Sequence, residues 1–247
     1  MEKRIFVISD LHGQFVLLQL LLQKINFSDN DELYILGDIM DRGPNSIDIY
    51  YFVQAMDNIH MIKGSCSRGC RLRWRDPPAR TRGSGRLWKQ NGALKTVNSI
   101  REYLQKDYIP YEEYFDLKQM FIKELISFID SLPSYIELDL NDKHYVLVHA
   151  GVDPEVPLEE NSEEILAWIR EYFYLNEANP DYTYIFGHTP CCFINDDHSF
   201  DIWYDPDYHN KIAIDGGLAV GNKGQLNCLC LTNGEVTVIK YEEGQPK

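Results

Sequence analysis

Apolar runs alternate with helical patterns near the start of the chain, and a polar residue or a glycine follows each apolar run. Residues 4–8, 33–36 and 59–62 predict buried strands, and residues 15–25 and 46–56 predict the helices between them. This alternation predicts right-handed crossovers and a largely parallel sheet. Ligands bind beyond the carboxyl ends of the strands in such sheets, and Asp10, Asp38 and Gly64 stand at these ends.

The rest of the chain also predicts an α/β fold, with more strands toward the C-terminus. Helical patterns occupy residues 87–104, 111–129 and 163–175, and strand patterns occupy residues 135–140, 145–148, 182–186, 211–214, 226–231 and 235–240. Asn141-Asp142 and Asn233-Gly234 are typical of hairpin turns. We expect one domain over residues 1–247, with a loop at residues 65–87.

Composition narrows the class of protein. The chain has 247 residues and no run of about 18 apolar residues, so we expect no membrane span and no membrane partner. The first apolar run is too short for a secretion signal, which predicts a cytoplasmic protein. The net charge of −14 disfavours nucleic-acid binding, which requires a basic surface.

Side chains that ligate metals gather at the predicted strand ends. Asp10 and His12 are one residue apart just after a strand, and Asp38 arrives from the neighbouring strand. His149 and His188 follow two later strands. A carboxylate can bridge two cations, and imidazole suits zinc, iron and similar metals, so these residues predict a site for two divalent metal ions. Two such ions can bind a phosphoryl oxygen and lower the pKa of a bridging water.

Four ordered blocks carry a resemblance to a known family: Asp10-Leu11-His12, Gly37-Asp38-Ile39-Met40-Asp41-Arg42-Gly43, His149-Ala150-Gly151 and Gly187-His188-Thr189-Pro190. Over residues 3–217 the chain resembles the calcineurin-like metallophosphoesterases, and more narrowly the bacterial branch of the serine/threonine phosphoprotein phosphatases. The resemblance implies two packed sheets flanked by helices, with a two-metal site at the carboxyl ends of the strands.

The resemblance also implies how the metals are held. Asp10, His12 and Asp38 correspond to ligands of the first metal, with Asp38 bridging to the second. His149 and His188 correspond to ligands of the second metal. The two divalent ions would be manganese, iron or zinc.

The implied reaction is hydrolysis of phosphate monoesters by a hydroxide that bridges the metals. Arg42, together with Arg170 in Trp168-Ile169-Arg170, corresponds to phosphate-binding arginines. A salt bridge from Arg42 to Asp41, and a surface position for Arg170, are the plainer alternatives. The implied substrate is phosphoserine or phosphothreonine in a phosphoprotein, or a small phosphoester. Symmetrical hydrolysis of dinucleoside tetraphosphates is the alternative, because that group carries the same blocks.

One motif of the family is altered. Its Gly-Asn-His-Glu supplies an asparagine ligand to the second metal and a histidine that protonates the leaving group, and the residue matched by Asp41 orients that histidine. Here Ser65 and Cys66 follow Gly64 where asparagine and histidine belong. Loss of a general acid lowers the rate on poor leaving groups by about 10²–10⁴-fold. A catalytically impaired, phosphate-binding pseudoenzyme is therefore a third interpretation.

Residues 65–87 also differ from the rest of the chain in composition. They hold seven of its eleven arginines, no lysine and one acidic residue, and the family pattern resumes after them with its length preserved. Two compensating reading-frame changes, in the gene or in its sequencing, would explain this segment, and an unambiguous in-frame read tests that idea. The open alternatives are a phosphate or RNA patch formed by the arginines and a soft-metal pair formed by Cys66 and Cys70.

Overall fold

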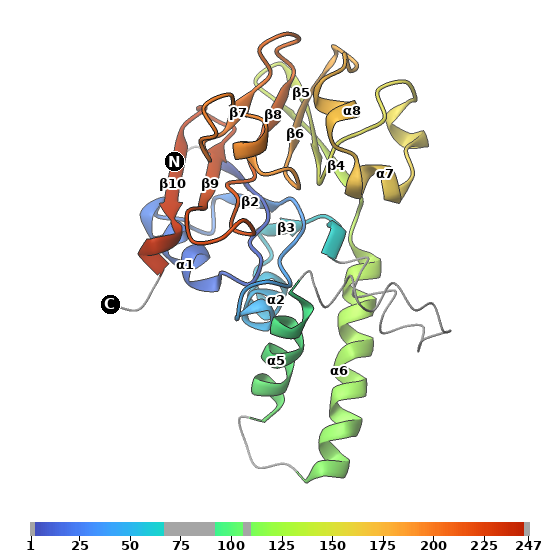
Figure 1. Ribbon diagram of the computed structural model, residues 1–247, viewed down its shortest axis with the longest axis vertical. Coiled ribbons are helices and arrows are strands. Elements are labelled where there is room, and N and C mark those ends of the chain that lie inside the picture. Colours follow the sequence, from blue (N-terminus) through green and yellow to red (C-terminus); the bar gives the residue numbers. More distant parts are fainter. Residues whose placement is uncertain (1–2, 67–91, 106–109, 245–247) are drawn as a thin grey trace.

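The computed structural model describes residues 3–66, 92–105 and 110–244 (Figure 1). Three features of the sequence analysis therefore lie largely or wholly outside the described residues: the loop expected at residues 65–87, the start of the helix expected at residue 87, and Cys70. Within the described part, none of the helices is long and apolar enough to cross a membrane.

The first sheet has the strand order β10-β9-β1-β2-β3. Its three N-terminal strands are β1 (Ile5–Ile8), β2 (Glu32–Ile35) and β3 (Ile59–Met61). They run parallel, as the alternation of strands and helices predicts, and α1 (Phe15–Lys24) and α2 (Ser46–Ala55) connect them. The C-terminal strands β9 (Gln225–Cys230) and β10 (Val236–Lys240) extend the sheet antiparallel.

The second sheet has the strand order β4-β5-β6-β8-β7. Its strands are β4 (Tyr135–Leu140), β5 (Lys143–Val148), β6 (Tyr182–Phe186), β7 (Trp203–Tyr204) and β8 (Lys211–Ala213). The central strands β5, β6 and β8 are parallel, and the edge strands are antiparallel. Asn141 and Asp142 join β4 to β5 with φ values of 51° and 58°, which confirms the predicted tight hairpin.

Three apolar clusters hold these layers together. One cluster lies between the sheets and includes Val7 and Leu36 from the first and Leu147 and Ile185 from the second. A second packs α1, α2, α5 (Ala93–Leu104) and α6 (Tyr111–Ser131) on the outer face of the first sheet. A third covers the outer face of the second sheet. The expected architecture of two packed sheets flanked by helices is confirmed, and Figure 1 shows α5 and α6 extending away from the sheets.

The prediction of a single helix over residues 163–175 is wrong. The structure has α7 (Glu163–Trp168) and α8 (Glu171–Tyr174), and the chain leaves the helical conformation between them. Arg170 has φ −135° and ψ −112°, and its guanidinium donates to the His188 carbonyl oxygen at 3.0 Å. This tertiary contact overrides the local helical preference. Short 3-10 turns complete the structure: Leu158–Glu160, Cys191–Phe193 and Tyr241–Gly244.

Candidate metal centre

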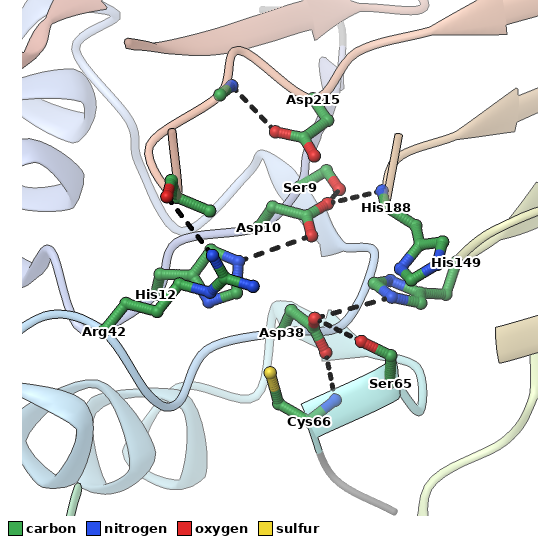
Figure 2. A network of polar contacts seen from close by, with 12 residues as sticks. Ser9, Asp10, His12, Asp38, Arg42, Ser65, Cys66, His149, His188 and Asp215 are labelled. Carbon is green, nitrogen blue, oxygen red and sulfur yellow. Dashed lines mark hydrogen bonds and ion pairs between the residues drawn. The ribbon is translucent and has the colours of Figure 1, made fainter. Parts of the chain in front are cut away.

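The five predicted metal ligands come together where strands from both sheets end (Figure 2). Asp10 follows β1 and Asp38 follows β2, while His149 follows β5 and His188 follows β6. All five side chains, two carboxylates and three imidazoles, are buried. Buried polar groups need partners, so this cluster requires an explanation beyond packing.

Asp38 belongs to two groups of potential ligands. Its carboxylate, His149 and His188 place their ligand atoms within 4.8 Å of one another, and we call this group the His149 side. The ligand atoms of Asp38, His12 and Cys66 meet the same limit, and we call this group the Cys66 side. A carboxylate shared by two donor groups is the arrangement that a bridging ligand requires.

The His149 side fits a divalent cation. The Nε2 atoms of His149 and His188 are buried and have no hydrogen-bond partner among the described residues. The Nδ1 atom of His149 lies 2.7 Å from the Leu36 carbonyl oxygen, so it carries the proton and leaves the Nε2 lone pair directed into the site. His149 Nε2 is 3.6 Å from Asp38 Oδ2. Two ligands on one tetrahedral ion stand about 3.3–3.8 Å apart, so these donors are already at ligating separation.

On the Cys66 side, the imidazole of His12 is oriented in the same way as that of His149. The Nδ1 atom of His12 lies 3.0 Å from the Met40 carbonyl oxygen, which again leaves Nε2 for the site. His12 Nε2 is 3.8 Å from Asp10 Oδ1. The other oxygen of Asp10 accepts hydrogen bonds from the Ser9 hydroxyl and from the backbone N–H of His188. Asp10 is therefore held between the two sheets.

Backbone strain concentrates at this centre. Eleven described residues other than glycine have positive φ, and six of them are predicted site residues: Asp10, His12, Asp38, Asp41, Arg42 and His188. Residues with side chains rarely occupy this region, because each such conformation costs free energy that the surrounding structure must offset. The strained residues follow strand ends, where the chain must turn sharply to direct side chains into one crevice.

Burial sets the charges at the centre. Burial alone would raise the pKa of Asp38, but His149, His12 and the Cys66 N–H hold the pKa well below its ordinary value. Burial, together with His149 and Arg170, lowers the pKa of His188 to about 2, so its imidazole is neutral, as a metal ligand must be. Asp215 is buried near Asp10, and both burial and that carboxylate raise the pKa of Asp215.

The two predicted phosphate-binding arginines lie on different elements. Arg170 Nη1 donates to the His188 carbonyl oxygen and to Thr189 Oγ1, each at 3.0 Å, so it is anchored beside the His149 side. Arg42 is exposed, and its Nη1 donates to the Ala219 carbonyl oxygen at 3.2 Å. A salt bridge between Arg42 and Asp41 is not among the ion pairs of the described residues.

Asp41 has a different partner from the one that the family pattern implies. The Thr96 hydroxyl donates to Asp41 Oδ1 at 2.7 Å and accepts the Asp41 N–H at 2.9 Å. Burial raises the pKa of Asp41 to about 6, although Thr96 opposes the shift. The Asp41 carboxylate is therefore held by a hydroxyl from α5.

The altered motif contacts Asp38 directly, which the sequence analysis did not foresee. The buried Ser65 hydroxyl donates to Asp38 Oδ2 at 2.7 Å, and the Cys66 N–H donates to Asp38 Oδ1 at 2.8 Å. Figure 2 shows the Ser65 hydroxyl directed at Asp38 from the side nearer to His149, and the Cys66 sulfur on the opposite side of Asp38. The available signal was the position of this segment after Gly64, at the end of β3.

Comparison with known proteins identifies the family. The model of the family described as calcineurin-like phosphoesterase matches residues 3–214. The chain belongs to the calcineurin-like phosphoesterase family. The hydrolase chemistry expected from the four motif blocks is therefore confirmed at the level of the family.

Curated relatives carry a narrower name. The symmetrical bis(5'-nucleosyl)-tetraphosphatase of Erwinia tasmaniensis is 28% identical over 152 residues, which is 61% of this chain and 45% of that protein. The enzyme of the same name from Vibrio parahaemolyticus is 27% identical over 184 residues, or 69% of this chain and 57% of that protein. The match thus spans about half the length of these relatives.

Solved structures share the fold. A protein whose suggested activity is diadenosine tetraphosphatase superposes with a TM-score of 0.62 at 16% identity, over 96% of this chain and 92% of that one. A serine/threonine phosphatase from Saccharomyces cerevisiae gives a TM-score of 0.56 at 14% identity, over 97% and 80% of the two chains. At these identities the similarity establishes the fold alone.

Proposed function

We propose that the chain hydrolyses a phosphoanhydride bond of dinucleoside tetraphosphates, using two divalent metal ions. The observation that carries the proposal is Asp38, shared by two groups of donors, together with two buried histidine nitrogens that lack partners. Divalent ions bound there supply electrophilic activation of a phosphoryl group and of water. Asp10, His12 and Asp38 would hold one ion, and Asp38, His149 and His188 the other.

The chemistry of the leaving group favours this substrate class. Symmetrical hydrolysis breaks the central P–O–P linkage, adds the elements of water and yields two nucleoside diphosphates. A terminal phosphate has a second pKa of about 6, so the diphosphate departs as a stable anion without a proton donor. Hydrolysis of phosphoserine expels an alkoxide, which needs a proton as it leaves. Cys66 stands where the family's proton-donating histidine belongs, so the anhydride suffers less from the change.

The names of the curated relatives support the same choice. Those with the matches above are symmetrical tetraphosphatases. The serine/threonine phosphoprotein phosphatase expected first from the sequence becomes the second candidate, supported by the shared fold of the yeast phosphatase. The pseudoenzyme is the third, and it requires metal binding without turnover.

The remaining polar residues would position the substrate. Arg170 is anchored beside His188 by two hydrogen bonds and still has guanidinium nitrogens for phosphate oxygens. Arg42 lies exposed at the edge of the Cys66 side, where it would neutralise a second phosphate. Thr96 would hold Asp41 and so fix the turn that carries Arg42.

Product analysis tests the proposal. The purified chain is incubated with diadenosine tetraphosphate and either Mn²⁺ or Zn²⁺, and the nucleotides are separated by anion exchange, with Asp38→Asn as the control. We expect ADP as the sole product from the natural chain and almost none from the variant. AMP with ATP would contradict symmetrical cleavage, and turnover of a phosphoserine peptide without ADP formation would favour the second candidate. Bound metal with no turnover of either substrate would favour the pseudoenzyme.

A further inference from the structure

We propose that Cys66 is itself a metal ligand and that its sulfur makes the Cys66 side select Zn²⁺ or Co²⁺ over Mn²⁺. The inference rests on the proposed metal centre but not on the choice of substrate. The family pattern places histidine at this position, as a proton donor rather than a ligand, so the assignment is specific to this chain.

The placement of the donor atoms carries the proposal. The Cys66 sulfur, a His12 nitrogen and an Asp38 oxygen lie within 4.8 Å of one another, and Asp10 Oδ1 is 3.8 Å from His12 Nε2. Ligands on a tetrahedral Zn²⁺ stand about 3.3–3.8 Å apart, so side-chain adjustments of about 1 Å would bring the sulfur, the His12 nitrogen and the Asp38 oxygen to ligating separation. These three donors would then hold the ion, with Asp10 next to His12.

The backbone already orients Cys66 toward this group. Its N–H donates to Asp38 Oδ1 at 2.8 Å, and the preceding Ser65 hydroxyl occupies Asp38 Oδ2 at 2.7 Å. Each carboxylate oxygen has two lone pairs, so both can accept these hydrogen bonds and still bind a cation. Figure 2 shows that Ser65 and Cys66 direct their side chains to opposite sides of Asp38, which separates the sulfur from His149.

An independent observation favours metal binding at this centre. The Nε2 atoms of His149 and His188 are buried without hydrogen-bond partners on the neighbouring side of Asp38. A cation held there would use one oxygen of Asp38, and the other oxygen faces the segment that carries Cys66. The sulfur is therefore added to a centre with its own reason to bind metal.

Sulfur changes which ion the centre prefers. Thiolates favour zinc and other borderline or soft ions, whereas carboxylates and carbonyls suit Mg²⁺ and Mn²⁺. Cys66 is half-buried, while the other described cysteines, at 191, 192, 228 and 230, are buried. Among the described thiols it is thus the one that lies beside potential metal donors and is partly open to solvent.

Cobalt substitution tests the assignment without any substrate. The chain is freed of metal with a chelator and titrated with Co²⁺, and the near-ultraviolet thiolate-to-Co²⁺ charge-transfer absorption is recorded. We expect the band in the natural chain and in the matched control Cys228→Ala, which removes a thiol from the core of the first sheet. We expect no band in Cys66→Ser. A natural chain that binds Co²⁺ without the band, or a band that survives in Cys66→Ser, would overturn the proposal.

Two further variants locate the sulfur within the centre. His12→Ala should shift or abolish the band, and His188→Ala should preserve it, because His188 belongs to the other donor group. The reverse result would overturn the assignment to the Cys66 side. Loss of an outer-sphere partner of a metal ligand lowers metal affinity by roughly 10–100-fold. Competition titrations should therefore show that Cys66→Ser, which removes a ligand itself, weakens Zn²⁺ binding by at least that factor. The change in Mn²⁺ binding should be smaller. Because none of these readouts involves turnover, they can succeed even if the substrate proposal fails.

Discussion

The His149 side and the Cys66 side share Asp38 but differ in composition. On the His149 side two imidazoles come from strand ends of the second sheet, and their Nε2 atoms are buried and unpartnered. The half-buried Cys66 stands where the family's histidine belongs. Ser65, whose hydroxyl donates to Asp38 Oδ2, stands where the family's asparagine ligand of the second metal belongs. The His149 side therefore keeps both imidazole donors but has serine in place of the family's asparagine ligand, whereas the Cys66 side has a sulfur in place of the family's proton-donating histidine.

The comparison teaches that metal binding and proton donation are separable in this fold. The five predicted metal donors follow four different strands of the two sheets, β1, β2, β5 and β6, so a change in one segment removes few of them. The proton donor depended on a single motif after β3. We therefore expect reactions with good leaving groups to survive the change and reactions with poor leaving groups to be lost.

The largest expected effect comes from breaking both sides at once. Asp38→Asn removes one negative charge from the residue common to both donor groups. Loss of several kcal/mol of transition-state stabilisation lowers kcat/KM for diadenosine tetraphosphate by roughly 10³-fold or more. Steady-state kinetics and metal analysis of the folded variant measure the effect. Near-normal kcat/KM would show that Asp38 does not join the two sides.

A smaller effect comes from restoring the family motif on the Cys66 side. In Ser65→Asn/Cys66→His an imidazole returns at the position where the family has its proton donor, and hydrolysis of a phosphoserine peptide should rise by at least about 10²-fold. Hydrolysis of diadenosine tetraphosphate and of p-nitrophenyl phosphate should rise far less, because their leaving groups need little protonation. Ser65→Asn/Cys66→Gln serves as the control without an acid. Equal gains on all three substrates would contradict the separation of metal binding from proton donation.

The next effect concerns the His149 side, where Arg170 is anchored at His188. Arg170→Ala should lower kcat/KM by about 10–100-fold, since hydrogen bonds to charged groups contribute about 1.5–3 kcal/mol. Arg170→Lys keeps the charge without the planar guanidinium group, and its kcat/KM should lie between those of the natural chain and Arg170→Ala. The kinetics are compared at equal metal occupancy. An Arg170→Ala variant with unchanged kcat/KM would leave only a structural role for this arginine.

The smallest expected effect is on folding stability, at an ion pair that lies away from the metal centre, and its pH dependence serves as a reference. Arg4 forms two hydrogen bonds with the buried Asp31, at 2.9 and 2.7 Å, and holds the pKa of that carboxyl below its ordinary value. A lowered folded-state pKa means that the ion pair stabilises the fold above the unfolded pKa of about 3.9 and that this contribution is lost as pH falls through the folded pKa. Because the Arg4 side chain is 37% exposed, we expect about 1 kcal/mol.

Urea unfolding of the natural chain and Asp31→Asn measures this pH dependence. The difference in unfolding free energy should stay constant between about pH 7 and pH 5 and shrink below about pH 4. A difference that instead grows as the solution is acidified would contradict the assigned direction. Activity that is lost at a pH above about 4 then reflects the metal centre and not the loss of this ion pair.

Much of the fold was predictable because strand and helix patterns in the first sheet are local. The runs that form β1, β2 and β3 lie within a residue or two of their predicted bounds, and their alternation with helices fixes their parallel order. The break at Arg170 was not predictable, because its cause is a contact with His188, which lies 18 residues further along the chain. The short strand β7 pairs only with β8 and carries little pattern of its own.

The candidate site, like the fold, has residues that could be predicted from the sequence and residues that could not. Asp10, Asp38, His149 and His188 were predicted to converge because residues after parallel strands meet at one edge of a sheet. The roles of Ser65 and Cys66 were not predictable, since the sequence offered Cys66 only as a partner of Cys70. Its relation to His12 depends on how the segment after β3 turns back onto Asp38, which is set by two hydrogen bonds that no pattern in the sequence encodes.

The most direct measurement is the ratio of kcat/KM for diadenosine tetraphosphate to kcat/KM for a phosphoserine peptide, in the metal-loaded natural chain. We expect the ratio to favour the tetraphosphate strongly and to fall by about 10²-fold or more when Ser65→Asn/Cys66→His restores the imidazole. A natural chain that prefers the phosphopeptide, or a ratio that the restored motif leaves unchanged, would contradict the claim that this centre has kept its aspartate and histidine metal donors while losing its proton donor.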